Sequence, residues 1–326
     1  MHYDVLIIGS GFGGSVSALR LIEKGYRVGV VESGKRFGKD DYPNSNWNLR
    51  RFLWFPRLGM RGIQRLTLLK DVLVLSGAGV GGGSLVYANT LYEPHNAFYT
   101  DQAWANITDW KAELAPFYDQ ARRMLGSTPN PSTTPSDLVL KDVASHFGVE
   151  GTYQPTPVAV YFGESGVTKA DPYFGGAGPD RTGCVTCGGC MVGCRFDAKN
   201  TLDRNYLYLA EQAGAAVHPE TQVVNVSPQR DGGYEIVTER PGAWFRKRRR
   251  TFTADQIVFS AGALGTSRLL LELKEESLPH LSDRIGRSVR TNSEALLGAT
   301  ATNLNTDYSE GIAITSSIHP EPHTHI

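Results

Sequence analysis

Three glycines near the start of the chain, Gly9, Gly11 and Gly14, have the spacing Gly-x-Gly-x-x-Gly. The first permits a tight turn, the second lets a pyrophosphate approach the backbone, and the third allows close packing of helix on strand. The helix that follows would offer amide donors and its positive dipole end to the phosphates. Glu32, which ends the next apolar run, would accept hydrogen bonds from the ribose hydroxyls of an adenosine. The spacing therefore predicts a dinucleotide site.

The cysteines of the chain form a second cluster of residues suited to chemistry. All four lie close together, as Cys184, Cys187, Cys190 and Cys194. Their spacing is that of a bacterial ferredoxin segment, with Arg195 in place of the usual proline. Four thiolates could hold an iron–sulfur cluster or a structural zinc ion, and reduced or paired thiols in a covering loop are the third interpretation. The spacing leaves all three open.

The elements around the first glycines can be read from their apolar pattern. Residues 4–8 form a continuous apolar run, Val16, Leu19 and Ile22 recur at helical spacing up to Gly25, a candidate C-cap, and residues 27–31 form a second run. This pattern predicts a strand, a helix and a parallel strand, with the glycine turn at the carboxyl edge of the sheet. Residues 257–262 form a later buried strand, so the chain is expected to return to this sheet.

The rest of the chain is patterned less regularly. We expect short helices or loops over 34–65 and a covering segment without a clear period over 151–183. The pattern further predicts a helix over 110–125 capped by Thr108, helices over 205–213 and 266–273, and an antiparallel ribbon of 223–226 with 234–239. The basic run at 246–250 is read as a solvated hairpin.

Composition limits the classes of partner. The 326 residues include 33 Lys and Arg against 33 Asp and Glu, so no net field attracts a polyanion and nucleic acid is not the expected partner. The best apolar run, 66–75, is too short to span a bilayer and is broken by Lys70 and Asp71. No secretory signal is recognised, and a cytoplasmic protein of two domains is expected.

A second glycine-rich loop bears on which dinucleotide is bound. Residues 76–84 include Gly79, Gly82, Gly83 and Ser84, and a late segment contains Ala261 and Gly262. A buried flavin on a long ribityl–pyrophosphate tether needs backbone donors along its length, which a nicotinamide enzyme does not. These segments favour FAD over NAD.

Together these segments resemble the glucose-methanol-choline (GMC) oxidoreductase family, and within it the cholesterol oxidases. The resemblance rests on the first glycine motif and on residues 79–86, 110–118, 260–270, 287–294 and 316–320. It implies an α/β fold, in which a Rossmann-like FAD-binding domain carries an inserted α+β covering or substrate region. The implied parts are an FAD domain at 1–110 and 201–296, a covering region at 111–200, and the start of a substrate-domain sheet at 297–326.

The resemblance also implies an activity. It predicts oxidation of a small-molecule alcohol, the 3β-hydroxyl of a sterol, with hydride transfer to FAD and electrons passed to O2 to give hydrogen peroxide. It adds Asn89 and Val224 to the FAD contacts, although related loops continue with Asn-Gly where this chain has Tyr87-Ala88-Asn89. Two alternatives remain, a dehydrogenase that sends electrons through a centre at the cysteines and a non-catalytic flavin-binding fragment.

No catalytic residue is assigned within the chain. The resemblance places the family's catalytic His and Asn beyond Ile326, so we expect the first half to two-thirds of a family member. His319, His323 and His325 could chelate a metal or supply a base, and are interpreted as an exposed polar end. Glu294 is interpreted as an ordinary hydrogen-bonded carboxylate.

Overall fold

The computed structural model describes residues 1–243, 247–292, 294–302 and 305–326. These form two compact units, Met1–Val86 with Thr201–Gly298, and Tyr87–Asn200 with Ala299–Ile326. The first unit is discontinuous in sequence because the chain leaves it after Val86 and returns at Thr201. Two expectations fall partly outside the described residues, since the basic run begins at Arg246 and the resemblance at 287–294 includes Ser293. The functions expected of the two units stay predictions.

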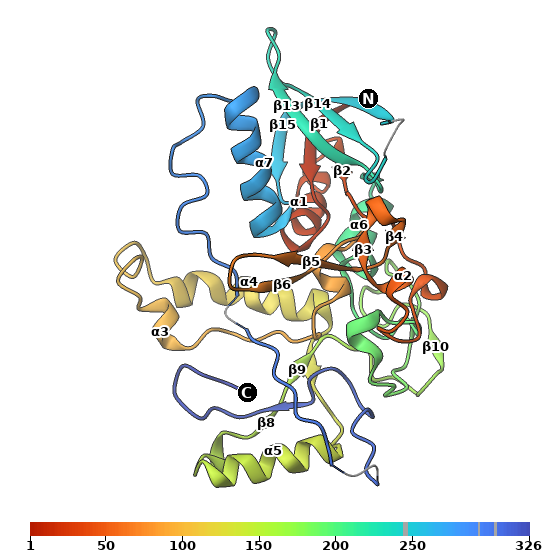
Figure 1. The fold of residues 1–326 in the computed structure, drawn as a ribbon, viewed down its shortest axis with the longest axis vertical. Coiled ribbons are helices and arrows are strands. Elements are labelled where there is room, and N and C mark those ends of the chain that lie inside the picture. Colours follow the sequence, from red (N-terminus) through yellow and green to blue (C-terminus); the bar gives the residue numbers. More distant parts are fainter. Residues whose placement is uncertain (244–246, 293, 303–304) are drawn as a thin grey trace. The chain divides into compact units, whose positions relative to one another are not determined.

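The first unit is built on one six-stranded sheet (Figure 1) with the order β12-β2-β1-β15-β14-β13. The first four strands of this order are parallel, and β14 is antiparallel to both of its neighbours. The elements of the sheet and its helices are β1 (His2–Ile8), α1 (Phe12–Ile22), β2 (Val28–Val31), α6 (Tyr206–Gln212), β12 (Ala216–His218), β13 (Gln222–Pro228), β14 (Tyr234–Glu239), β15 (Arg249–Phe259) and α7 (Gly262–Glu276). The predicted strand–helix–strand unit, the ribbon and the late return to the sheet are all present.

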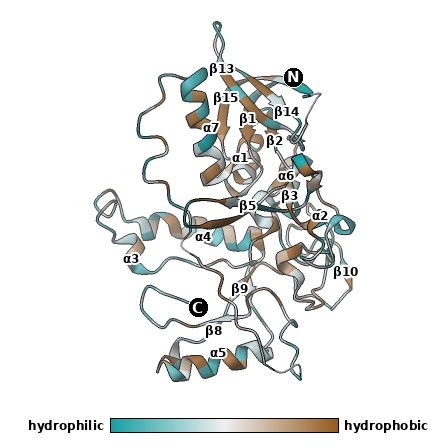
Figure 2. Ribbon diagram, in the orientation of Figure 1, coloured by the Kyte–Doolittle hydropathy of each residue, from teal (hydrophilic) through white to brown (hydrophobic). Residues whose placement is uncertain are grey.

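The apolar run of β1 is continuous because both faces of the strand are covered. Leu6 and Ile8 belong to one core cluster with Leu269 and Leu273 of α7. Ile7 points the other way, toward α1, where its side chain lies near Gly14. A parallel strand buried on both faces is expected to show this pattern rather than alternation. Figure 2 shows the apolar colouring of β1 between these helices.

Three predicted element ends differ from the structure. The cap of α1 is Glu23, whereas Gly25 follows it with a left-handed φ of 87° and donates its N–H to the Ile22 carbonyl. The strand expected at 257–262 begins at Arg249 and ends at Phe259, so Gly262 already starts α7. Long-range pairing with β14 and β1 extends β15 beyond its apolar stretch, which the local pattern could not show.

Smaller elements complete the first unit between β2 and the second glycine loop. They are α2 (Leu49–Phe52), the ribbon of β3 (Trp54–Phe55) with β4 (Met60–Arg61), and the ribbon of β5 (Gln64–Leu68) with β6 (Leu73–Gly77). The apolar run at 66–75 is therefore a β-hairpin. In the described part of the chain, no helix combines the length and apolar character that a membrane crossing requires.

The second unit combines helices with two-residue strands. It contains α3 (Asn96–Tyr99), α4 (Trp110–Leu125), β7 (Thr128–Pro129), α5 (Pro135–His146), β8 (Gln154–Pro155), β9 (Pro157–Val158), β10 (Thr168–Lys169), β11 (Arg181–Thr182) and β16 (Ser316–Ser317). The predicted helix α4 is present, but its cap is Asp109, which accepts from the Ala112 N–H at 3.2 Å, and not Thr108. Gly126 ends it in the left-handed conformation.

Asp137 ties helix α5 to the last strand of the second unit. Its Oδ2 accepts from the main-chain N–H of Thr134 at 2.6 Å and from that residue's hydroxyl at 2.8 Å, which forms a capping box. Its Oδ1 accepts from Thr315 and Ser316 near the other end of the chain. Burial would raise the pKa of Asp137, but these hydrogen bonds hold it below its usual value.

Candidate cofactor sites

The first glycine turn lies where the carboxyl ends of three parallel strands meet. Gly9 follows β1, and its N–H donates to Val31 of β2 at 2.9 Å. On the other side, the N–H of Ser260, just after β15, donates to Ile8 at 2.8 Å. A Cβ on Gly9 would lie 2.4 Å from the Ser260 carbonyl oxygen, so only glycine allows this approach. This edge is the usual ligand position in open α/β sheets.

The second glycine loop packs directly on the first. A short 3-10 helix, Gly82–Leu85, carries Gly82 at φ 53°, where a Cβ would lie 2.5 Å from the Gly11 Cα. The Ser10 hydroxyl accepts from the Gly81 N–H at 3.1 Å. Two loops about seventy positions apart therefore form one backbone surface, as the FAD hypothesis requires.

Buried polar atoms surround the second loop. The Ser84 hydroxyl donates to the Gly81 carbonyl at 2.7 Å and accepts from the Leu202 N–H at 2.9 Å. The Oδ1 of Asp203 and the Nδ2 of Asn205 are buried and have no hydrogen-bond partner among the described residues. Because buried polar atoms are normally satisfied, these two point to a polar group that the protein alone does not provide.

The Glu32 carboxylate accepts hydrogen bonds from the protein itself, in addition to the predicted contact with a ribose. It is 7% exposed. Its Oε2 accepts from the N–H of Ser10 at 3.1 Å and from the Ser10 hydroxyl at 2.8 Å, and its Oε1 accepts from the N–H of Gly34 at 2.8 Å. The carboxylate therefore fixes the first glycine turn to the end of β2, in addition to the ribose contact that we predict.

The remaining predicted FAD contacts of the first unit also lie near this edge. The Thr221 N–H donates to the Glu32 carbonyl at 2.8 Å, which brings the start of β13 beside Glu32. Val224 follows at a register irregularity in β13 between Val223 and Asn225. Ala261 precedes Gly262 at the start of α7, next to the Gly9 turn. Their contact with FAD stays a prediction.

The edge fits the diphosphate of a dinucleotide. Helix α1 starts at Phe12 without a side-chain cap on Gly11 and without an acidic residue in its first turn. A helix start of this kind favours an anion. Gly11 is open, since an added Cβ would meet only the Gly82 Cα, at 4.0 Å. The helix start and the open Gly11 are therefore compatible with a diphosphate, and its binding at this edge stays a prediction.

Asn89, the other predicted flavin contact, belongs to the second unit. Its side chain is fully buried, its φ is 69°, and its amide lies beside the Cys190 thiol, on which it acts as a hydrogen-bond donor. Its carbonyl accepts from the Ala159 N–H at 2.7 Å. A flavin contact at Asn89 stays a prediction.

The four cysteines of the second unit line one cavity. They are free of disulfides, and Cys187 is the exposed member. Burial raises the pKa of the Cys184 thiol to about 11. It also raises that of Cys190, although the nearby Lys199 ammonium opposes the shift. Without a metal, these two thiols are protonated at neutral pH.

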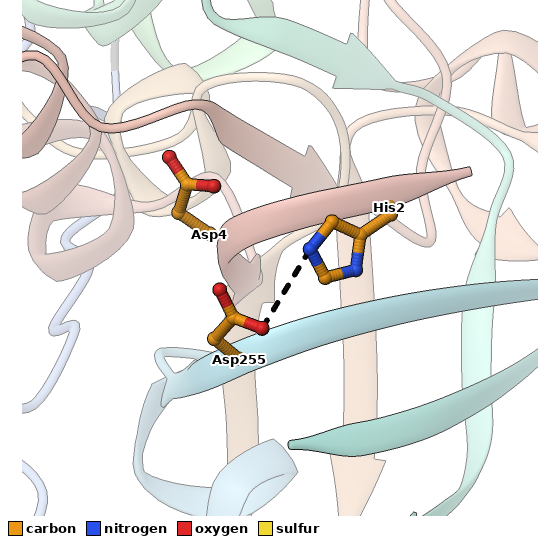
Figure 3. Close-up of side chains that lie close together, drawn as sticks. All are labelled: His2, Asp4 and Asp255. Carbon is orange, nitrogen blue, oxygen red and sulfur yellow. Dashed lines mark ion pairs between the residues drawn. The ribbon is translucent and has the colours of Figure 1, made fainter. Parts of the chain in front are cut away.

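Three metal-ligating side chains that the sequence did not single out lie together on the first unit (Figure 3). The ligand atoms of His2, Asp4 and Asp255 fall within 4.8 Å of one another. His2 is 3.6 Å from Asp255, while Asp4 accepts from the Arg27 main-chain N–H at 2.6 Å and lies 3.6 Å from its guanidinium. The neighbouring cation argues for a surface ion-pair network rather than a metal site.

Histidines at the end of the chain meet others that the sequence did not connect with them. The rings of His95 and His319 lie 5.1 Å apart, and those of His319 and His325 lie 5.9 Å apart. Burial, followed by the charges of the other two, lowers the pKa of His319. His319 is thus part of a ring cluster rather than a lone exposed residue, whereas His323 is exposed.

A cavity of about 280 Å3 lies beside this cluster in the second unit and was also missed by the sequence reasoning. Its walls include His95, Lys111 and Tyr118. A sterol needs a larger and more apolar space, so this cavity does not fit the predicted substrate.

Comparison with known proteins now decides the family. A family model described as GMC oxidoreductase matches residues 3–273. The chain belongs to the GMC oxidoreductase family. The match confirms the expected family and fold, and members of this family are FAD-binding oxidoreductases.

Curated relatives within the GMC family are more specific. The chain is 56% identical over 99% of its length to a cholesterol oxidase of Mycobacterium tuberculosis and 48% identical over 99% to one of Acinetobacter baumannii. It spans 57% and 60% of the length of these two relatives.

Solved structures of the family share the fold at lower identity. Pyridoxine 4-oxidase from Mesorbium loti has a TM-score of 0.53 at 18% identity, covering 83% of this chain and 51% of its own. A fungal aryl-alcohol oxidase has a TM-score of 0.51 at 15% identity, covering 81% and 46%.

Proposed function

We propose that the chain binds FAD at the carboxyl edge of the six-stranded sheet and serves the oxidation of a sterol 3β-hydroxyl. The observation that carries this proposal is the contact of Gly82 with Gly11, which joins two distant glycine loops into one backbone surface beside the start of α1. The relatives named cholesterol oxidase support the sterol as substrate.

The chain's own residues would hold the cofactor by position and charge. The start of α1 would face the diphosphate, and Glu32 would lie at the adenosine ribose. Main-chain N–H groups of the loop containing Gly82 and Ser84 would follow the tether toward the flavin, while the buried Oδ1 of Asp203 would accept a hydrogen bond. FAD bound there would supply the hydride acceptor for the carbon that bears the hydroxyl.

The electron acceptor distinguishes two catalytic forms of this proposal. An oxidase passes both electrons to O2 and produces hydrogen peroxide. A dehydrogenase uses another acceptor, and the cysteine cluster is the candidate relay. A protein that binds FAD without turnover is the third outcome. A cytoplasmic location also stays a prediction, which cell fractionation would test.

The experiment begins with cofactor content. The purified chain is heated, and the supernatant is analysed for FAD by chromatography and fluorescence. We expect close to one FAD per chain, or uptake of added FAD with quenched fluorescence. Folded protein that neither contains nor takes up FAD would refute the cofactor proposal.

Substrate and acceptor are tested on the flavin-loaded chain. Under anaerobic conditions, cholesterol should bleach the flavin absorbance, while its 3α-hydroxy epimer serves as the matched control. Peroxide formed in air identifies an oxidase, and bleaching without peroxide identifies a dehydrogenase. Bound FAD that cholesterol does not reduce would leave flavin binding but refute sterol oxidation by this chain.

A further inference from the structure

The cysteine segment of the second unit is folded around its four sulfurs. Between Cys184 and Cys194 the chain reverses repeatedly, with left-handed φ values at Thr186, Gly188 and Gly193. The Gly188 N–H donates to the Gly311 carbonyl, and the Gly311 N–H donates to Thr186, each at 2.9 Å. A segment far along the chain therefore fixes the turn that carries Cys187.

Main-chain donors point at the sulfurs. The Thr186 N–H lies 3.4 Å from the Cys184 Sγ, and the Cys194 Sγ accepts from Ala198 at 3.3 Å and from Lys199 at 3.4 Å. The Ala313 N–H acts on Cys190 in the same way. A thiol is a weak acceptor that does not need such donors, whereas a ligating thiolate is stabilised by them.

A buried cation lies beside the same sulfurs. Lys199 is 2% exposed, and its ammonium donates to the Cys190 carbonyl at 3.0 Å and to the Tyr87 carbonyl at 2.8 Å. It also lies 4.9 Å from the Tyr87 ring centroid. An ammonium in this position would stabilise negative charge on the neighbouring sulfurs.

The four sulfurs are not gathered as closely as a single tetrahedral ion would hold them. A tetrahedral zinc with bonds of about 2.3 Å holds its sulfurs about 3.8 Å apart. Among the described residues, which include all four cysteines, no three of these sulfurs lie within 4.8 Å of one another. In an iron–sulfur cluster the cysteines bind different irons and are more widely spaced. All four cysteines are among the residues that line the small cavity at this place.

We propose that Cys184, Cys187, Cys190 and Cys194 ligate an iron–sulfur cluster. Four S–H bonds are replaced by four Fe–S bonds, and four protons pass to solvent, with iron and sulfide supplied as the assembled cluster. Lys199 and the main-chain donors hold the resulting negative charge. The inference is independent of FAD binding, because these cysteines lie outside the unit that carries the glycine loops.

The test measures metal and sulfide in the whole chain, purified without exposure to air. We expect iron and acid-labile sulfide in near-equal amounts, about three to four of each per chain. Cys194→Ser should lower both on the order of tenfold. Met191→Ser, which introduces the same side chain in the same segment, keeps all four thiols and lies outside the lining of the cysteine cavity, is the matched control and should retain both.

Separate readouts keep the outcomes distinct. Circular dichroism checks that Cys194→Ser is folded, and FAD is assayed in the same samples, so that loss of the cluster is not confused with loss of flavin. If Cys194→Ser does not fold, metal and sulfide in the unaltered chain still decide. One zinc per chain without sulfide, four free thiols without metal, or disulfides among these cysteines would each overturn the proposal.

Discussion

The contact between Gly82 and Gly11 is the most direct point at which to perturb the proposed FAD edge. In Gly82→Ala, the backbone must keep a φ of 53° with a side chain present, and the new Cβ would lie 2.5 Å from the Gly11 Cα. Ordinary contacts of this kind are closer to 3.4–4 Å. The two loops must therefore separate, since the obstacle is backbone that has no alternative rotamer.

The expected loss of stability in Gly82→Ala has two contributions. A left-handed alanine costs about 1–2 kcal/mol relative to glycine. Separation of the loops also weakens the buried hydrogen bond from Gly81 to the Ser10 hydroxyl, worth about 1 kcal/mol. We therefore expect Gly82→Ala to lose about 2–3 kcal/mol of unfolding free energy and at least about tenfold in FAD affinity.

Gly83→Ala is the matched control. Its φ is not left-handed, and its Cβ would meet only the Phe12 ring, at 3.9 Å. We expect its unfolding free energy to change by no more than about 0.5 kcal/mol. Urea unfolding of flavin-free samples, followed by circular dichroism, gives both free energies, and fluorescence titration gives FAD affinity. Equal stability of the two variants would show that the loops do not touch as described.

Three further predictions concern single buried groups. Glu32→Gln leaves one of the main-chain N–H donors facing an amide NH2, so the unfolding free energy measured in urea should fall by about 1–3 kcal/mol. An unchanged urea midpoint would contradict these hydrogen bonds. Asp137→Asn should lower the unfolding free energy by about 2 kcal/mol at neutral pH, while Asp142→Asn, at an exposed position of the same helix, should change it little. Because the pKa of Asp137 is lowered, its stabilisation is present above about pH 3.9 and is lost as the pH falls through the folded value, so the two variants should converge in acid. Burial, with Arg250 and the amino terminus nearby, lowers the pKa of His218. The unfolding free energy should therefore fall as the pH drops below about 6.5, and it should fall less in His218→Gln. Parallel pH profiles of the two proteins would exclude His218 as the cause.

Local sequence pattern was enough to predict the central strands and helices. The apolar runs at 4–8 and 27–31 and the helical spacing between them encode a parallel strand–helix–strand unit, because each pattern records which faces of one element are buried. The return of the chain at 257–262 could be predicted for the same reason. Family resemblance supplied the expected cofactor.

Tertiary structure decided how separate segments meet. No local pattern shows that Gly82 packs on Gly11, that Glu32 accepts three donors from the first turn and the end of β2, or that His95 joins His319. Such contacts join residues that are far apart in the sequence, so they depend on how the intervening elements fold and pack. The cap of α4 at Asp109 rather than Thr108 is a smaller example, since both residue types suit the position.

The two candidate cofactor sites differ in how much of each could be predicted from the sequence alone. Glycine spacing predicted a tight turn after β1 that suits a nucleotide, because the steric need for glycine is local to that turn. Cysteine spacing alone left cluster, zinc and free thiols open. The fold then added the donors at the sulfurs, the buried Lys199 and the separation of the sulfur atoms, which are properties of packing around the segment rather than of its sequence.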